Sequence, residues 1–219
     1  MEIINAKGEL LDRALKFRSR IMNETFGVES DIDIWDEVAH HICYVYDDHI
    51  VGYYRAIPYT DKNFYTESEF DLTGLNIDKN KILEIGRACI DSNFRNGSVI
   101  PALWSKVLET ASEMNAEYVM GAASIIPTTH DVYYLKAHWL QKYNYLSNNH
   151  AMPLNRFNSI SGRIKDVPRL IEVYERVGAR IVSDPSYDPI FNTADVVTLL
   201  EVHNINSRWL DKLVKQRSE

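Results

Sequence analysis

KILEIGRACIDSNFRNGSVIPALWSKVLE, residues 81–109, contains the pattern that decides the fold. Its first part, residues 82–90, is apolar and partly β-branched, which predicts a short buried strand. Glu84 and Arg87 interrupt this apolar run, and charged groups are costly to bury unless they are paired. The two charges therefore indicate either a structural salt bridge at a sheet edge or a functional site built on the strand.

The second part of the stretch is a turn that leads into a helix. Residues 91–97 are turn formers, and from Ser98 to about Met114 the apolar residues recur at helical spacing. A strand, a turn with a glycine and a basic residue, and a helix start can together hold a phosphate. The reason is that free backbone N–H groups and the positive end of the helix dipole face the anion. Many α/β proteins have the same pattern and bind no phosphate.

Composition suits one compact domain, residues 1–219, because 45% of the residues are hydrophobic and 25% are charged. No segment resembles a signal peptide, and no apolar run approaches the roughly 20 residues that span a bilayer. Cys43 and Cys89 lie in apolar, strand-like contexts without the spacing of metal ligands. We therefore expect core thiols, a reducing cytoplasmic location and no metal site.

Charge is unevenly distributed along the chain. The formal net charge of −7 argues against a nucleic-acid partner. Thirteen acidic and four basic residues lie between Glu29 and Glu84, whereas residues 155–180 hold six basic and three acidic residues. The basic segment is either a solvated helix face or a docking patch for an acidic partner.

Hydrophobic periodicity and turn residues predict the other elements. Helices are expected at 9–26, 128–146, 167–178 and 205–217, strands at 41–47, 50–58, 117–124 and 196–202, and loops at 59–80 and 184–195. The strand at 117–124 ends in small residues, which indicates close approach of a ligand or of another backbone.

Six segments, in order from near the start to near the end of the chain, carry a family resemblance. They are FRSRIMNETFG (17–27), YYRAIP (53–58), FYTESEFDL (64–72), LEIGRACIDSNFRNGSVIPALW (83–104), YVMGAAS (118–124) and GARIVSDPSYDPIFNTADVVTLL (178–200). Through them the chain resembles the GNAT superfamily, and within it the ornithine-lipid-type N-acyltransferases that depend on acyl-carrier protein. It is more loosely similar to N-acyl amino acid synthases and acyl-homoserine-lactone synthases. The resemblance implies an α/β (α+β), GNAT-like fold with a mixed twisted central sheet flanked by helices.

The resemblance also implies an activity. The enzyme would move a long-chain fatty acyl group, with or without a 3-hydroxyl, from acyl-carrier protein to the amine of an amino acid such as ornithine. The co-substrate would be the acyl-4′-phosphopantetheine of that carrier, or acyl-CoA, and no bound cofactor is expected. The expected partners are the carrier and the amino-acid acceptor, with peripheral contact at the inner face of the membrane as an option. Three other functions stay open: acyl-homoserine-lactone-like transfer, acetyl-CoA-dependent transfer, and a non-catalytic GNAT-like binding module.

Glu84 is the expected base and Arg87 the second catalytic residue. A carboxylate in an apolar strand has its pKa raised toward the range that is useful for taking a proton from an amine. Residues three apart face opposite sides of a regular strand, so a bulge would be needed to bring the two together. Otherwise Arg87 is the structural partner of another acid.

Donor and acceptor residues follow from the same segments. The strand edge and the turn are expected to bind the phosphopantetheine through Ala88, Cys89, Ile90, Arg95, Gly97, Ser98 and Val99. The acyl chain and the acceptor are expected to contact Arg18, Arg55, Ala122, Ala123 and Ser124. Residues 95–98 match only part of the pyrophosphate-binding motif of the acetyl-CoA-dependent GNAT enzymes. The turn therefore suits a donor with a single phosphate better than full coenzyme A.

Overall fold

One mixed sheet organises the molecule, which we describe from a computed structural model covering residues 2–95, 97–125, 150–155, 169–206 and 208–209. Eight of the described strands form it, in the order β1-β2-β3-β5-β6-β10-β8 with β9 paired to β10. The strands are β1 (Glu2–Asn5), β2 (His40–Tyr46), β3 (His49–Pro58), β5 (Ile82–Ile90), β6 (Tyr118–Ile125), β8 (Arg180–Ile181), β9 (Ser186–Asp188) and β10 (Thr193–Glu201). A second small sheet pairs β4 (Phe70–Asp71) with β7 (Met152–Pro153). The predicted fold class, a mixed sheet flanked by helices, is confirmed.

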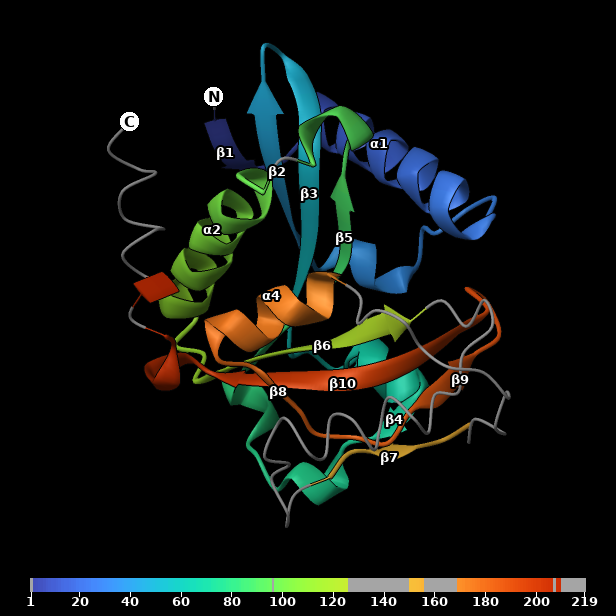
Figure 1. Cartoon of the computed structure of the whole chain (residues 1–219), viewed down its shortest axis with the longest axis vertical. Helices are drawn as coiled ribbons and strands as arrows, with labels where there is room; N and C mark the ends of the chain where they lie inside the picture. The colour runs from blue at the N-terminus through green and yellow to red at the C-terminus, as the bar shows by residue number, and fades with distance from the viewer. Residues whose placement is uncertain (1, 96, 126–149, 156–168, 207, 210–219) are drawn as a thin grey trace.

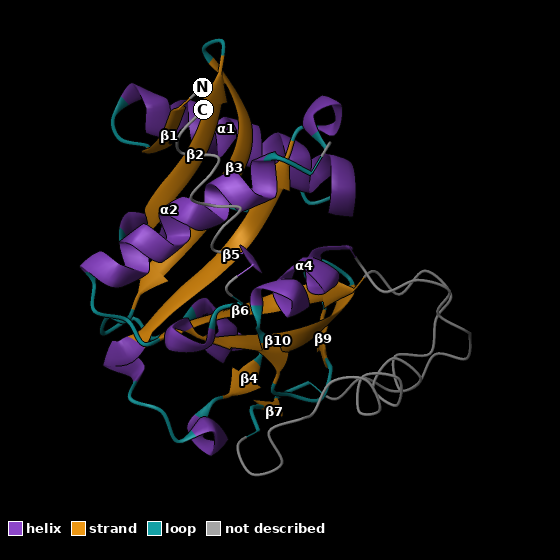
Figure 2. Ribbon diagram, turned by 60° about the vertical axis from the view of Figure 1, so that its left-hand side comes forward, coloured by secondary structure: helices purple, strands orange, loops and turns teal. Residues whose placement is uncertain are grey.

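Helices cover both faces of the sheet (Figure 2). The α-helices are α1 (Glu9–Phe26), α2 (Val99–Glu113) and α4 (Arg169–Val177), and the 3₁₀ helices are η1 (Ile34–Glu37), η2 (Tyr65–Ser68), η3 (Thr73–Leu75), η4 (Lys79–Lys81), η5 (Ser92–Phe94) and η6 (Val202–Asn204). Helix α1 packs with Cys43 and Tyr53, whereas α2 packs with their chain neighbours Ile42 and Tyr54. Because adjacent strand residues point to opposite faces, the two helices lie on opposite sides of the sheet.

Helix α1 has the predicted bounds, 9–26. Its apolar positions recur at helical spacing, so Ala14, Phe17 and Ile21 are buried together against the sheet. Gly27 ends the helix in the left-handed conformation, with φ 73°, and its N–H donates to the Asn23 carbonyl. The predicted helix after the turn is also confirmed, as α2, and it begins directly after Ser98.

The sheet splits between β5 and β6 (Figure 1). These two strands run parallel and pair over three residues only, Ile82–Glu84 with Tyr118–Met120. Gly121 marks the point of closest approach, because a Cβ there would lie 2.2 Å from the Ile85 carbonyl oxygen. In Figure 1 the strands β2, β3 and β5 stand upright while β6 and β10 lie across the view, so the two halves of the sheet diverge beyond this point.

A bulge lies in β5 beside the split. The register with β3 shifts between Tyr53 and Arg55, since Tyr53 pairs with Cys89 and Arg55 pairs with Gly86. Arg87, inside the bulge, has the positive φ of 52° that non-glycine residues rarely adopt. The bulge considered from the sequence is therefore present.

Several elements differ from the sequence prediction. Strand β1 was not predicted, and β9 together with the start of β10 lies where residues 184–195 were expected to form a loop. The helix expected at 128–146 lies outside the described residues, as does most of the one expected at 205–217. Within the described parts of the chain, no helix is long and apolar enough to cross a bilayer.

Candidate active site

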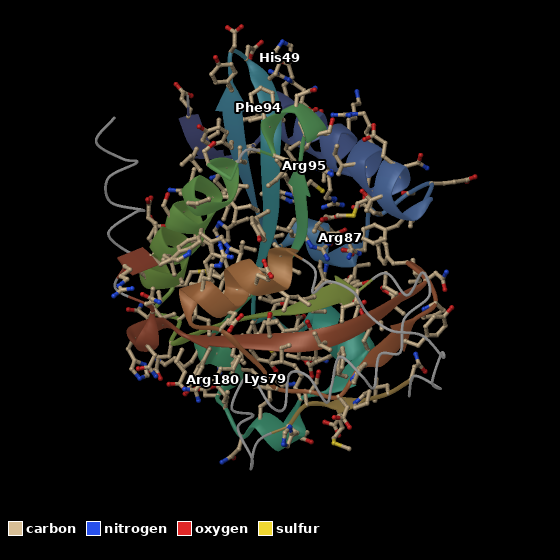
Figure 3. The ribbon with its side chains drawn as sticks, in the orientation of Figure 1. His49, Lys79, Arg87, Phe94, Arg95 and Arg180 are labelled. Carbon is tan, nitrogen blue, oxygen red and sulfur yellow. The ribbon has the colours of Figure 1, made fainter. Side chains whose placement is uncertain are left out.

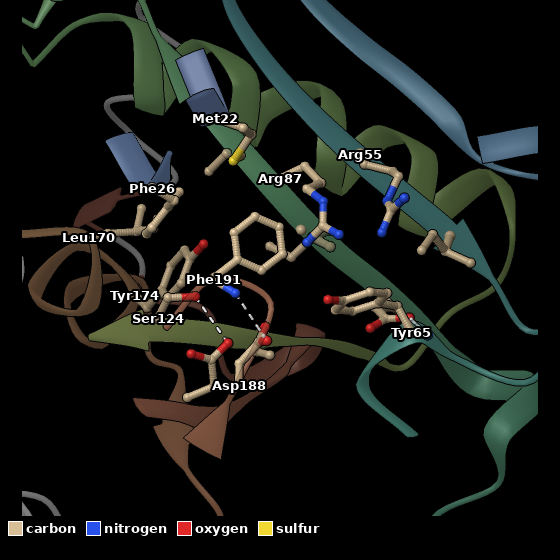
Figure 4. Close-up of a pocket in the computed structure, with 17 residues that line it drawn as sticks. Met22, Phe26, Arg55, Tyr65, Arg87, Ser124, Leu170, Tyr174, Asp188 and Phe191 are labelled. Atoms are coloured by element: carbon tan, nitrogen blue, oxygen red, sulfur yellow. Dashed lines mark hydrogen bonds between the residues drawn. The ribbon is translucent and has the colours of Figure 1, made fainter. Parts of the chain in front are cut away.

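A cavity of about 120 Å³ occupies the split between β5 and β6 (Figure 4). Its wall combines residues from both helical layers and both halves of the sheet. They are Met22, Phe26, Arg55, Ile57, Tyr65, Glu84, Ile85, Gly86, Arg87, Ala88, Ala122, Ser124, Leu170, Tyr174, Asp188, Phe191 and Asp195. Six of the fourteen site residues predicted from the sequence line the cavity. The cavity also has an apolar wall and two acids that the sequence analysis did not name, Asp188 and Asp195.

Glu84 lies at the cavity with 2% of its surface exposed. Its carboxylate accepts hydrogen bonds from the backbone N–H groups of Tyr65 and Thr66, both at 2.8 Å, and from the Thr66 hydroxyl at 2.5 Å. Burial raises the pKa of Glu84, and the hydrogen bonds from Thr66 partly oppose that rise. The residue therefore both anchors the start of η2 and presents a carboxylate of raised pKa to the cavity.

Arg55 and Arg87 stand side by side on the cavity wall. Arg55 pairs with Asp33 at 2.6 Å, and Arg87 pairs with the other oxygen of Asp33 at 3.4 Å. Both guanidinium groups lie over the Tyr65 ring, at 5.4 and 4.5 Å from its centroid. The sequence analysis gave two alternatives for Arg87, a bulge in the strand or an ion pair with another acid. Both are present, since the described ion-pair partners of Arg87 are acids other than Glu84.

Arg18 lies behind these residues and does not line the cavity. Its side chain is fully buried and pairs with Asp31 at 2.7 Å and Asp36 at 2.6 Å. Asp36 also pairs with Arg55, at 3.1 Å. Arg18 thus reaches the cavity only through the acids that hold Arg55, and direct contact with an acceptor stays a prediction without geometric support.

Three buried carboxyl groups, Glu69, Asp188 and Asp195, form a cluster, and two of them, Asp188 and Asp195, line the cavity. Oxygen atoms from the three lie within 4.8 Å of one another. Burial, followed by the neighbouring charges, raises the pKa of Glu69 to about 9, and burial raises the pKa of Asp195 to about 6. Sequence reasoning missed this cluster, although its members lie in the FYTESEFDL and SYDPIFNTAD segments that carried the resemblance.

Apolar side chains form the rest of the wall. Met22 and Phe26 come from α1, Leu170 from α4, and Phe191 from the loop before β10. Of the small residues predicted on β6, Ala122 and Ser124 line the cavity. Ala123 does not line it, because strand alternation points its side chain into the main core.

The predicted donor residues continue from the cavity along β5 toward its far end (Figure 3). Beyond Glu84, the β5 edge that faces β6 has no strand neighbour within the described chain, so residues 85–90 offer a free edge. Ala88 lines the cavity, whereas the side chains of Cys89 and Val99 are buried in the two cores.

The turn expected to hold a phosphate follows that edge. Arg95 is exposed, and its Nε donates to the Ile90 carbonyl at 3.3 Å. Gly97 has φ 92°, and Ser98 directly precedes α2. The turn, the exposed guanidinium and the helix start therefore lie together as predicted, and their role in donor binding stays a prediction.

Comparisons with known proteins find one similar family and several similar enzymes. The family model described as acetyltransferase (GNAT) domain matches residues 15–105. The L-ornithine N(alpha)-acyltransferase of Agrobacterium fabrum is 27% identical over 221 residues, covering 89% of this chain and 75% of the relative. The protein of the same name from Rhodobacter capsulatus is 25% identical and covers 74% of this chain and 68% of the relative. Residues 15–105 are thus similar to the GNAT acetyltransferase domain, and most of the chain is similar to proteins named L-ornithine N(alpha)-acyltransferase.

Solved GNAT structures support the assignment of the fold. FeeM, an N-acyl amino acid synthase from uncultured soil microbes, superposes with a TM-score of 0.62 at 13% identity, covering 97% of this chain and 99% of FeeM. An aminoglycoside 6′-N-acetyltransferase complexed with coenzyme A gives a TM-score of 0.58 at 14% identity, covering 92% and 97% of the two chains. At these identities the superpositions establish the GNAT fold alone.

Proposed function

We propose that the protein transfers a fatty acyl group from a carrier thioester to the amine of an amino acid such as ornithine. Acyl-carrier protein is the proposed donor. The curated relatives named L-ornithine N(alpha)-acyltransferase support this choice of acceptor. The observation that carries the proposal is the cavity itself, because one wall holds buried acids and arginines and the other holds Met22, Phe26, Leu170 and Phe191.

The chemistry assigns a task to each polar group. The acceptor enters as an ammonium ion, which has no lone pair, so a base must first take its proton. Glu84 is the proposed base, directly or through a water molecule, because its pKa is raised and it lines the cavity. Arg55 would pair with the carboxylate of the amino acid, since a guanidinium group matches a carboxylate in geometry.

Transfer then proceeds by addition and elimination. The amine nitrogen attacks the thioester carbonyl carbon, and the carbonyl oxygen becomes a tetrahedral oxyanion. Arg87 is the proposed donor to this oxyanion, because its guanidinium group lies at the cavity on the same strand as Glu84. The oxyanion then re-forms the carbonyl group and the C–S bond breaks. The thiolate leaves and takes up the proton that the attacking nitrogen loses, and the C–N bond of the amide remains.

The donor arm would lie along the free edge of β5. The amide groups of phosphopantetheine can pair with backbone 88–90 as an added strand would. The phosphate would then reach Arg95 and the backbone N–H groups at the start of α2. The apolar wall would receive the acyl chain, because burying each methylene group contributes about 0.8 kcal/mol.

Product formation from defined donors tests the proposal. Purified protein is incubated with a long-chain acyl-carrier protein and ornithine, thiol release is followed, and the product is identified by mass spectrometry. We expect one equivalent of thiol for each N-acyl amino acid formed, and much slower product formation with Glu84→Gln. A parallel reaction with acyl-CoA of the same chain length should be much slower, and equal efficiency would contradict the carrier protein as donor.

A further inference from the structure

Glu69 is a buried acid that makes no hydrogen bond through its carboxyl group in the described part of the chain. The residue is 5% exposed, and neither oxygen of its carboxyl group has a hydrogen-bond partner within the described chain. The other two acids of the cluster are partnered. The Asp195 oxygens accept from Thr193 at 2.6 Å and Ser124 at 3.0 Å, and Asp188 accepts from two backbone N–H groups. An unpartnered carboxyl group beside two other acids is destabilising unless something else binds there.

The cluster is suited to a cation. Its three members are each at least 95% buried, and the described chain places no ion-paired lysine or arginine on any of them. Arg87 is a positive charge that lowers the pKa of Glu69, but its effect is smaller than the opposing effects of burial and of the two aspartates. The cluster also opens onto the cavity, since Asp188 and Asp195 line its wall.

An ammonium group fits better than a divalent metal ion. An ammonium donates three hydrogen bonds, one for each carboxyl group, and N–H···O bonds of about 2.9 Å put the acceptor oxygens roughly 4.7 Å apart. One carboxyl oxygen from each acid lies no more than 4.8 Å from those of the other two, so a single ammonium group can reach all three. Calcium and magnesium ions require about six or more oxygen ligands, and the arginines on the same cavity wall would repel a double positive charge more strongly.

We propose that Glu69, Asp188 and Asp195 bind the side-chain ammonium of a dibasic amino-acid acceptor. This inference rests on the proposed function and specifies its substrate class. Glu84 and two acids of the cluster, Asp188 and Asp195, line the same cavity, so one acceptor can present one amine to Glu84 and the other to the cluster. The amine held by three carboxylates stays protonated and cannot attack the thioester, because opposite charge favours the charged form. The other amine, beside Glu84, loses its proton and is acylated.

Paired acceptors test the inference. Norvaline has the same carbon chain as ornithine but lacks the side-chain amine, so the ratio of the two kcat/KM values isolates recognition of that amine. We expect the wild-type protein to favour ornithine at least about a hundredfold, because a polar site rejects a ligand that leaves it unpaired. Glu69→Gln should lower the ratio toward one, and Asp71→Asn, which neutralises an exposed acid two residues away, should leave it unchanged.

Binding without a donor separates this inference from the proposed function. Calorimetry in buffers of different ionisation enthalpy should show more proton release near pH 7.5 for ornithine than for norvaline, because the bound ammonium lowers the raised pKa of Glu69. Glu69→Gln should abolish that difference and should also raise Tm without acceptor, since it removes an unpartnered buried acid. If Glu69 served only to stabilise the fold, Glu69→Gln would instead lower Tm.

Each other outcome overturns one proposal or the other. Equal kcat/KM for ornithine and norvaline would overturn the ammonium site and leave N-acyl transfer standing. Selective ornithine binding without acylation of any amino acid would overturn the proposed transfer and leave the ammonium site standing. Binding of Mg²⁺ or Ca²⁺ that Glu69→Gln abolishes, with ornithine binding unaffected, would make the cluster a metal site.

Discussion

Buried charge is the dominant feature at the scale of single residues. Arg18, Arg55 and Arg87 share three aspartates, so each cation that faces the cavity is held by an anion behind it. Such pairs add little net stability, but removal of one partner is costly because the other is left as an uncompensated buried charge. The network therefore fixes where Arg55 and Arg87 point.

Replacement of Glu84 tests the proposed base. Glu84→Gln keeps the shape and removes the proton acceptor, so kcat should fall by roughly 10²–10⁴-fold at neutral pH while donor binding persists. Glu84→Asp should be intermediate, because its carboxylate is one methylene group shorter. Glu117→Gln, which neutralises an exposed acid just before β6, is the control. Near-wild-type turnover by a folded Glu84→Gln protein would exclude the role.

Thr66 separates catalysis from structure at the same site. Thr66→Val removes the hydroxyl group that stabilises the charged form of Glu84, so the pKa of Glu84 should rise further. A base is active only when deprotonated, and the acid limb of the kcat/KM profile should therefore move to higher pH. An unchanged limb in a folded variant would show that Glu84 only anchors η2.

Arg18 should control stability rather than turnover. Burial alone would raise the pKa of Asp36, but the hydrogen bond and charge of Arg18, together with Arg55, hold it well below its usual range. Because the pKa of Asp36 is lower in the folded protein than in the unfolded chain, ionised Asp36 stabilises the fold above about pH 4. This contribution is lost as the pH falls below that value. Arg18→Met should reduce the free energy of unfolding by about 3–5 kcal/mol at pH 7 and flatten this acid dependence.

Urea unfolding from pH 7 to pH 2 measures both effects. Arg13→Met on the same helix is the matched control, because its pair with Asp48 is exposed and should contribute less than about 1 kcal/mol. Equal loss of stability in the two variants would contradict the account of the buried network.

At the scale of elements, the split between β5 and β6 creates the site. Three residue pairs join the parallel strands β5 and β6 at one end. Beyond Glu84 the strands diverge, and the cavity lies between them. The bulge at Arg87 bends the same strand where it borders the cavity. One strand thereby supplies the carboxylate proposed as the base, a guanidinium group and a free edge.

Two glycines test the closure of the split. Gly121→Ala would place a Cβ 2.2 Å from the Ile85 carbonyl oxygen, and overpacking of this kind costs about 1–3 kcal/mol. Gly86→Ala meets nothing within 4 Å, so it should change the free energy of unfolding by less than about 0.5 kcal/mol. Denaturant unfolding of both variants compares them, and equal stability would show that the strands are not in contact at Gly121.

The sequence predicted these elements better than it predicted the residues that meet across them. Periodicity identified α1, the hairpin, β5 and α2, because each is a local pattern in which one face is buried. Strand β1 was missed because four residues give little periodicity, and β9 because its segment is rich in turn formers. The acid cluster was missed because residues 69, 188 and 195 meet only through tertiary packing.

The whole molecule is acidic, which matters for an acidic carrier protein. A net charge of −7 repels such a partner, so productive encounter requires a local basic surface within the screening length of about 10 Å. The basic segment at 155–180 is one candidate, and its basic residues Arg156, Arg163 and Lys165 lie outside the described residues. A second basic surface, Arg13, Lys16 and Arg20 of α1, lines a groove beside the β2–β3 hairpin and Phe94.

Arg95 tests donor binding at this scale. Arg95→Ala removes the exposed guanidinium group of the turn, so KM for acyl-carrier protein should rise about tenfold or more while kcat changes less. Arg180→Ala removes an exposed arginine at the far end of the sheet and should have no effect (Figure 3). An unchanged KM in the Arg95 variant would place the donor phosphate elsewhere.

Lipids from cells that express the protein test the central claim most directly. Mass spectrometry should detect a new N-acylated amino acid whose acyl chain is a long fatty acid, and fragmentation should place the acyl group on the α-amine of a dibasic amino acid. Cells that express Glu84→Gln at the same level should lack it. If the new products were acetylated amines alone, or if both strains made the same products, long-chain acyl transfer by this cavity would be contradicted.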